Sequence, residues 1–135
     1  MTRLAAIALL AFLCALPARA DQAAETLMRL NLIGRWAVDC ADPDGGISYA
    51  AAADGSAVYG NPVGSFPILA VTAAGRDVTV TIRFSRPVEE IRLNGFTIVD
   101  GNTVAPVMNR NERNEYTVRD GILLRTGKKM KEALQ

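Results

Sequence analysis

Turn-forming dipeptides recur along this chain between short apolar runs, and they constrain the fold more than any other feature. Asn-Gly and Asp-Gly tolerate the positive φ angles of a tight β-hairpin, so each pair predicts that one strand turns straight back on the next. Strands at roughly ten-residue spacing leave no room for the helical crossovers that parallel strands need. The sequence therefore predicts an antiparallel sheet. The five pairs are Asp44–Gly45, Asp54–Gly55, Asn94–Gly95, Asp100–Gly101 and Asp120–Gly121.

Alternation of apolar and polar residues locates the strands. It is clearest in Asp77–Phe84, where Val78, Val80 and Ile82 share one face of the strand. Such period-two alternation is typical of a strand with one buried face. The Asn94–Gly95 pair gives the strongest hairpin prediction, because apolar runs flank it on both sides. The predicted strands are Arg35–Cys40, Ile47–Ala52, Ser56–Tyr59, Phe66–Thr72, Asp77–Ser85, Val88–Leu93, Phe96–Val99, Thr103–Met108, Asn114–Arg119 and Ile122–Thr126.

The pattern predicts an all-β fold, an antiparallel up-and-down meander of eight to ten strands that closes into a barrel after one short N-terminal helix. Closure removes the two exposed edges of an open meander. A β-sandwich is the alternative, but it needs long connections, for which Asn61–Ser65 and Asn109–Arg113 are the longest candidates. The helix is expected over Asp21–Leu32, where apolar residues recur at helical spacing and Gly34 follows.

The first twenty residues resemble a bacterial signal peptide. Leu4–Leu16 is an apolar run of 13 residues, shorter than the roughly 20 that a membrane-spanning helix needs. Ala18-Arg19-Ala20 matches the small-x-small pattern of a cleavage site. We therefore expect residues 1–20 to be removed after Ala20. The product would be a periplasmic or secreted protein with one domain, residues 21–135, and no membrane span.

Cleavage after Ala20 would remove Cys14 and leave Cys40 as a single cysteine in an oxidising compartment. We expect Cys40 to be a buried small apolar residue on the first strand. One alternative is a disulfide between the Cys40 residues of two chains. The other is that the partner cysteine of Cys40 is missing because the C-terminus is unusual.

A helical segment followed by Gly34-Arg35-Trp36 at the head of the first strand resembles the start of lipocalin-like (calycin-type) barrels. The resemblance implies that Trp36 closes one end of the barrel against an arginine from the last strand, with Arg125 as first candidate and Arg119 as second. The stretch Leu32–Cys40 also looks like the opening of small exported bacterial proteins of unknown function. In those proteins the early cysteine has a late partner, which this sequence lacks.

The composition argues against several classes of function. With no histidine, the chain has no Ser-His-Asp or Cys-His nucleophile, and it shows no phosphate-binding loop and no metal-ligand spacing. A calcium loop counted from Asp42 would need a bidentate Glu at its twelfth position, where Ala53 stands. Glu89 and Glu90 would point to opposite faces of a strand, so they could not act as a glycosidase-type pair of carboxylates on one substrate. We therefore expect no enzyme, no metal and no cofactor, and the net charge of +1 gives no reason to expect nucleic acid as a partner.

Two charged segments have a structural reading and a functional one. The run Asn109–Glu115 is expected to be a polar loop, with a mobile lid over the barrel mouth as the alternative. Lys128, Lys129 and Lys131 are expected on a solvated terminal helix, with contact to a polyanion as the alternative.

Aromatic residues on apolar-facing strand positions suggest a binding role. An interior enclosed by about eight strands is either filled by side chains or just able to hold one small ligand. Small inward positions such as Val38 and Ala51 favour a cavity, but the sequence is compatible with both a filled interior and a hollow one. We expect a barrel that binds a small apolar ligand. The alternative is a protein-interaction module, such as an inhibitor of a secreted hydrolase acting through a loop or a free segment at Asp21–Ala24, or an envelope structural protein. The predicted ligand-binding residues are Trp36, Tyr49, Phe84, Phe96 and Tyr116.

Overall fold

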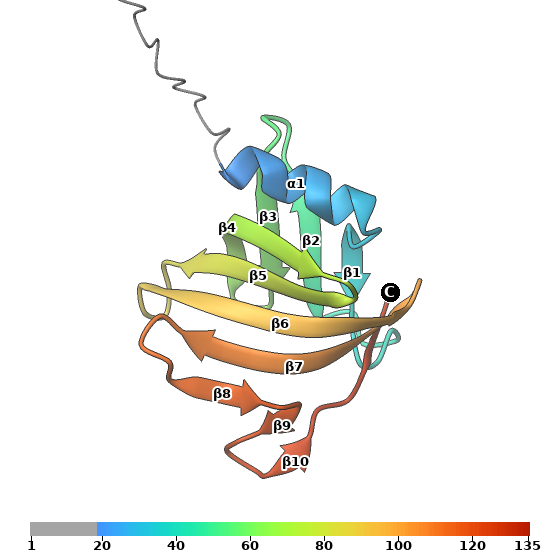
Figure 1. Cartoon of the computed structure of the whole chain (residues 1–135), viewed down its shortest axis with the longest axis vertical. Helices are drawn as coiled ribbons and strands as arrows, with labels where there is room; N and C mark the ends of the chain where they lie inside the picture. The colour runs from blue at the N-terminus through green and yellow to red at the C-terminus, as the bar shows by residue number, and fades with distance from the viewer. Residues whose placement is uncertain (1–18) are drawn as a thin grey trace, which may run out of the picture.

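The computed structural model of the chain describes residues 19–135 (Figure 1). The expected signal peptide lies outside these residues, except for Arg19 and Ala20, and so does Cys14. The described chain contains one helix, α1 (Arg19–Arg29), and eleven strands. The strands are β1 (Gly34–Trp36), β2 (Ile47–Ala51), β3 (Ala57–Asn61), β4 (Gly64–Ala74), β5 (Asp77–Phe84), β6 (Glu90–Asp100), β7 (Thr103–Asn111), β8 (Tyr116–Arg119), β9 (Ile122–Leu123), β10 (Lys128–Lys129) and β11 (Ala133–Leu134).

The strands form one antiparallel meander. Each strand from β1 to β10 pairs with the next one along the chain, and β11 pairs with β7. This arrangement confirms the prediction of an antiparallel meander with a single short helix. The ladder of strand pairs does not close on itself. Three of the predicted tight turns are confirmed, at Asp54–Gly55, Asp100–Gly101 and Asp120–Gly121.

The C-terminal segment lies between the beginning and the later part of the sheet (Figure 1). Leu134 pairs with Thr103 of β7, and it also exchanges two backbone hydrogen bonds with Ala37, at 2.9 and 2.8 Å. The side-chain amide of Gln135 donates to the carbonyl oxygen of Ile33 at 2.8 Å. Through these contacts the C-terminal segment joins β7 to Ile33 and Ala37, which lie on either side of β1. The sequence pattern predicted a solvated helix at this end of the chain.

α1 packs mainly against β4 and supplies Ala23 and Leu27 to the core, both fully buried. The predicted helix over Asp21–Leu32 is therefore shifted, since the chain leaves it after Arg29. Because Ala23 and Ala24 are buried against the sheet, the segment Asp21–Ala24 is not free to enter a partner's cleft. The largest fully buried side chains are those of Trp36, Phe66, Leu27, Leu32, Ile68, Ile82, Val78 and Val80.

The predicted hairpin at Asn94–Gly95 is wrong. β6 runs straight through this pair, and the sheet has a bulge between Gly95 and Phe96. A side chain at Gly95 would come within 3.1 Å of Met108 Cε, so this glycine permits close packing of two strands rather than a turn. The side chain of Asn94 pairs with that of Asn109 on the neighbouring strand, which occupies it within the sheet.

The first strand is shorter than predicted, and Cys40 is exposed rather than buried on a strand. The chain leaves the sheet because two aspartates form local turns. The carboxylate of Asp39 accepts a hydrogen bond from the backbone N–H of Ala41, and that of Asp42 from the N–H of Asp44. Val38 is exposed as a result, and so is Ala51 at the end of β2, so neither is an inward position.

Candidate functional site

A cavity of about 210 Å³ lies between the first strands of the sheet and β6, β7 and β8. Apolar side chains form most of its wall, and Met108 and Met130 line it together with them. No lysine, arginine, aspartate or glutamate is among its lining residues. The aliphatic part of the wall consists of Leu32, Ile47, Val104, Pro106, Val118 and Ala133.

Four aromatic side chains form another part of the wall. Tyr49 is central among them, with its ring centroid 6.0 Å from that of Tyr59 and 6.2 Å from that of Phe96. These separations lie within the range of favourable aromatic pairs. Trp36 is held in place by a hydrogen bond from its indole Nε1 to the carbonyl oxygen of Leu32, at 2.9 Å. The aromatic wall is therefore fixed by packing and by one hydrogen bond.

The hydroxyl of Tyr49 is a buried polar group. The residue is 3% exposed, and its Oη has no hydrogen-bond partner within residues 19–135. Burial raises the pKa of this hydroxyl far above its ordinary value, and the nearby Tyr59 raises it further. Burial also raises the pKa of Tyr59, although the side chains of Asn61 and Asn94 oppose that rise. Both tyrosines therefore keep their protons at neutral pH.

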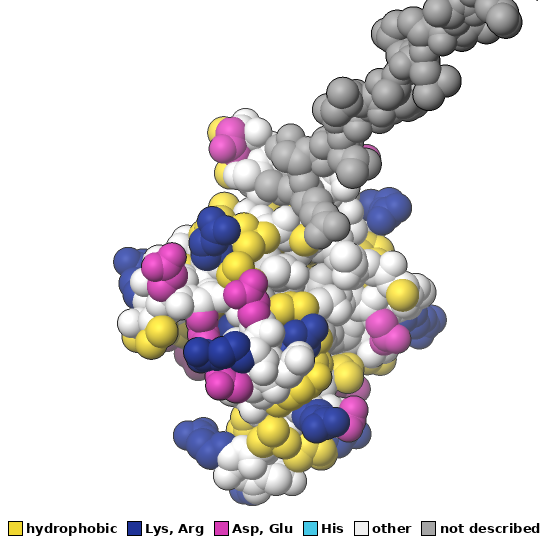
Figure 2. Space-filling view, turned by 60° about the vertical axis from the view of Figure 1, so that its left-hand side comes forward, with side chains coloured by type: hydrophobic (Ala, Val, Ile, Leu, Met, Phe, Trp, Pro, Cys, Tyr) yellow, Lys and Arg dark blue, Asp and Glu magenta, His cyan; other side chains and the backbone are white. Residues whose placement is uncertain are grey.

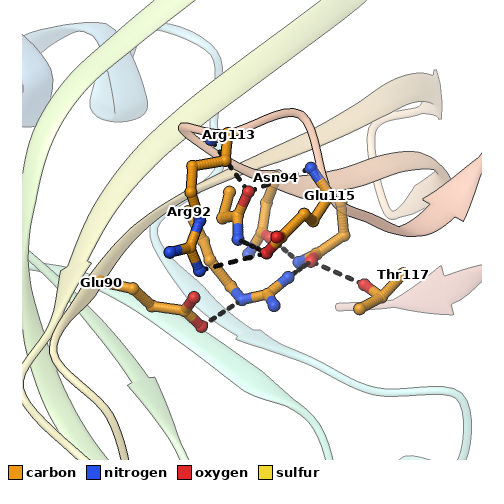
Figure 3. A network of polar contacts seen from close by, with 8 residues as sticks. Glu90, Arg92, Asn94, Arg113, Glu115 and Thr117 are labelled. Atoms are coloured by element: carbon orange, nitrogen blue, oxygen red, sulfur yellow. Dashed lines mark hydrogen bonds and ion pairs between the residues drawn. The ribbon is translucent and has the colours of Figure 1, made fainter.

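Asn94, Asn109 and Thr117 add amide and hydroxyl groups to the cavity wall. Asn94 and Thr117 belong to the network of polar contacts shown in Figure 3. The amide nitrogen of Asn109 donates to Asn94 Oδ1. Asn109 Oδ1 accepts hydrogen bonds from Arg92 Nη1 and from Thr117 Oγ1, the latter at 2.7 Å. Arg92 in turn is paired with Glu90 at 2.6 Å, and both side chains are mostly buried. The hydrogen-bonding groups at this end therefore largely satisfy one another.

A second set of polar contacts fixes the turn between β7 and β8. Asn111 is buried, and its Oδ1 accepts the backbone N–H groups of Arg113 and Glu115, both at 3.0 Å. The Asn111 side chain, and then Arg113, lower the pKa of Glu115 below its ordinary value. The expected polar loop over Asn109–Glu115 is wrong in its first part, because β7 continues to Asn111. These hydrogen bonds favour an ordered turn, and residues 111–115 are not among the lining residues of the cavity.

The structure brings together three of the five residues predicted to bind ligand. Trp36, Tyr49 and Phe96 line the cavity. Phe84 instead packs on Phe66, with ring centroids 4.7 Å apart. Tyr116 is half-buried on β8, where the guanidinium of Arg119 lies 5.2 Å from its ring centroid.

The arginine expected to cover Trp36 is not found beside it. Arg125 is exposed in the turn after β9, and Arg119 lies over Tyr116. In residues 19–135 the arginine–aromatic pairs are that one and Arg86 over Phe66. The buried face of Trp36 is covered by apolar packing instead.

Sequence reasoning missed several lining residues. Tyr59 follows Ala57 by two positions in a predicted strand, so alternation alone would have placed it inward. Asn94 was assigned to a turn, which hid its role on a strand. Met130 and Ala133 carried no signal, because the lysines around them suggested a solvated helix, whereas Lys128–Lys129 forms β10.

A second, more open hollow of about 380 Å³ lies beside the loop that precedes β2, and its lining includes Arg35, Asp44 and Asn61. On the face seen in Figure 2, basic and acidic side chains are interspersed, so this face carries no large region of one charge. Within the described part of the chain no three histidine, cysteine, aspartate or glutamate residues are grouped as metal ligands would be. The helix of that part is too short and too polar to cross a membrane.

No protein-family model, no curated protein and no solved structure matches this chain.

Proposed function

We propose that this chain is an exported, non-enzymatic protein that binds a small apolar ligand in the cavity between β2 and β7. The observation that carries the proposal is the composition of the wall, which combines an aromatic cluster with aliphatic side chains and contains no charged group. Few polar groups in an apolar concavity are typical of small-molecule sites. Trp36, Tyr49 and Phe96 are the contact residues in this proposal.

The volume of the cavity limits the size of the ligand. About 210 Å³ is larger than the roughly 150 Å³ apolar cavity that binds benzene in an engineered protein, and smaller than the roughly 300 Å³ at which pockets for drug-sized molecules begin. The proposed ligand is therefore a compound of about one ring.

We also propose that the fold is a lipocalin-like barrel completed by its C-terminal segment. The support is the pair of hydrogen bonds between Ala37 and Leu134, together with the pairing of β11 with β7. Ala133 lines the cavity, so this segment would form part of the ligand site.

A non-catalytic role fits the ionisable groups of the wall, which are Tyr49 and Tyr59. General acid–base catalysis works best when the pKa of the group lies near the working pH. Burial raises the pKa of both hydroxyls, which moves it further from neutral pH.

Trp36 provides a direct test of ligand binding, because it is the single tryptophan of the chain and lines the cavity. The fluorescence of Trp36 is expected to change as toluene is added, and the change should reach a plateau when the site is saturated. Val118→Phe, which fills the cavity, should abolish the change, with Val104→Leu as a second filling variant if the first does not fold. Val88→Phe is the matched control at a position 64% exposed and away from the cavity. A folded wild-type protein without a saturable response up to the solubility limit of toluene would refute the proposal.

Export requires a separate test. When the full chain is produced with its own N-terminus in a bacterium, the periplasmic fraction is expected to contain a protein that begins at Asp21. Recovery only from the cytoplasm, still beginning at Met1, would refute the exported part of the proposal and leave ligand binding unaffected.

A further inference from the structure

The hairpin formed by β9 and β10 carries positive charge and no negative charge. Residues 121–131 contain neither aspartate nor glutamate, and their four basic side chains are all exposed. The ion pairs formed within residues 19–135 belong to β6 and to the turn between β7 and β8, so none of these four side chains is paired with a carboxylate there. We call them the hairpin cations, and they are Arg125, Lys128, Lys129 and Lys131.

The acidic residues that adjoin the hairpin do not cancel its charge. Asp120 and Glu132 flank it at its two ends, and Arg119 adds one more cation. Arg119 of β8 and Lys129 of β10 stand in register with the same residue of β9 between them. Residues in register on antiparallel strands share a face of the sheet, so these two cations lie on one face. With five basic and two acidic residues, the stretch 119–132 keeps a net charge of +3.

The turn of the hairpin presents an exposed apolar side chain beside these cations. Leu124 is 51% exposed and comes directly before Arg125. The carbonyl oxygen of Leu123 accepts hydrogen bonds from the backbone N–H groups of Thr126 and Gly127, at 3.2 and 2.8 Å. These bonds fix the turn, so Leu124 is held in its exposed position.

The hairpin is placed where it can meet an extended surface. It lies at the end of the molecule away from α1 (Figure 1). At the lower end of Figure 2, basic side chains lie beside apolar ones. A flat partner can therefore contact the apolar turn and the hairpin cations at the same time.

An anionic lipid surface fits both the charge and the apolar turn. Each lysine or arginine near such a surface is attracted to it, and clusters of four to eight are a common signature of binding to anionic lipids. An exposed leucine gains free energy when it leaves water for an apolar phase. A nucleic acid would give Leu124 no such gain, and residues 121–131 hold no aromatic side chain to stack on a base. The combination favours a membrane.

We propose that the β9–β10 hairpin docks this protein onto a membrane surface that contains anionic lipids, with Leu124 entering the lipid layer and the hairpin cations facing the headgroup phosphates. The proposal goes beyond the proposed function and does not depend on it. Met130 follows β10 directly and lines the cavity, so docking brings the cavity close to the lipid.

Binding to lipid vesicles tests the proposal. The vesicles contain phosphatidylcholine alone, or equal parts of phosphatidylcholine and phosphatidylglycerol, and bound protein is measured by sedimentation at about 0.1 M salt, where charges more than about 10 Å from the lipid are largely screened. Every variant is produced from the full chain, so all share the same N-terminus. The hairpin variants are Lys128→Gln/Lys129→Gln and Leu124→Ser. Arg125→Gln/Lys131→Gln tests the charge at two other positions if the first double variant does not fold.

The matched controls change exposed residues away from the hairpin. Arg29→Gln/Arg83→Gln removes two exposed cations, at the end of α1 and on β5, that belong to no ion pair within residues 19–135. Val88→Ser removes an apolar side chain that is 64% exposed. Unfolding curves and Trp36 emission confirm that each variant is folded.

The wild-type protein is expected to bind the vesicles with phosphatidylglycerol, and to bind phosphatidylcholine alone far more weakly. Lys128→Gln/Lys129→Gln should weaken binding about 25-fold, which is about fivefold for each cation. Leu124→Ser should weaken it about fivefold, because this half-exposed side chain loses its contact with the lipid. Each control should stay within about threefold of the wild type.

The opposite results would overturn the proposal. They are no binding of the folded wild type to the anionic vesicles, equal losses in the hairpin and control double variants, or full binding by Leu124→Ser. Binding to DNA without binding to vesicles would also overturn it and would assign the hairpin cations to nucleic acid. The toluene titration of Trp36 is independent of vesicle binding, so failure of one proposal leaves the other standing.

Discussion

Replacement of Tyr49 by phenylalanine is expected to stabilise the protein, although it removes a polar group from the core. The hydroxyl is buried and has no partner within residues 19–135, and such a group costs about 1–3 kcal/mol of desolvation. The ring stays in place, so its contacts with Tyr59 and Phe96 remain. The small void left by one oxygen costs about 0.5 kcal/mol. The net expectation is a gain of about 0.5–2.5 kcal/mol in the free energy of unfolding.

For a domain of this size, at about 4 °C per kcal/mol, that gain corresponds to a rise of about 2–10 °C in Tm. Urea and thermal denaturation at neutral pH measure it, on protein refolded from urea so that no ligand is carried through. Tyr116→Phe is the control, because this half-buried side chain lies outside the cavity, and its change should stay within about 0.5 kcal/mol. A loss of 1 kcal/mol or more in Tyr49→Phe would show that Oη has a partner in solution, and it would refute the expected stabilisation.

Three further predictions concern the pH dependence, a loop and the C-terminal segment. Because the folded protein holds the Tyr49 proton above pH 10.0, the ordinary pKa, while the unfolded chain releases it there, the free energy of unfolding should fall as pH rises above about 10. Urea curves at alkaline pH should show a shallower fall in Tyr49→Phe. Gly46 and Gly55 both have a φ of +86°, but a side chain at Gly46 would overlap the backbone at the end of β1, whereas Gly55 has open space. Gly46→Ala should therefore cost about 1–3 kcal/mol more than Gly55→Ala, measured by thermal denaturation. Leu134→Pro removes a donor that bonds at 2.8 Å and should cost about 2–3 kcal/mol in urea denaturation, whereas Lys131→Pro at an exposed position should cost about 0.5 kcal/mol or less.

The strands were predictable where one face is buried. In β5, Val78, Val80 and Ile82 are all buried and the residues between them are more exposed, as alternation predicted. This works because side chains of a strand alternate between two faces, so burial leaves a period of two in the sequence. Antiparallel order followed from the same pattern, because short loops join neighbouring strands.

Local patterns misled where contacts distant in sequence decide the structure. Asn94–Gly95 has the composition of a turn, yet Gly95 gives space to Met108 and Asn94 bonds to Asn109, both on the next strand. Cys40 was expected to continue the first strand, but the aspartates after Ala37 bend the chain out of the sheet.

The candidate site was predictable only in part for the same reason. Trp36, Tyr49 and Phe96 stood out as aromatic residues at inward positions. The unpaired state of the Tyr49 hydroxyl depends on what lies around it in space, so composition and spacing carry no trace of it. The contribution of Ala133 to the wall depends on a strand pair that no turn signal announces.

The contact between Ala37 and Leu134 sets an order of events in folding. The two residues are 97 positions apart, and closing such a loop costs about 3 kcal/mol more than closing the five-residue loop between β2 and β3. Two hydrogen bonds offset little of this cost, so we expect the contact to form after the rest of the sheet has brought its partners together. The same segment is then the first to detach in the native state, as local opening begins where few contacts hold the chain. Because Ala133 lines the cavity, such openings would give a small molecule a way in and out while the sheet stays folded.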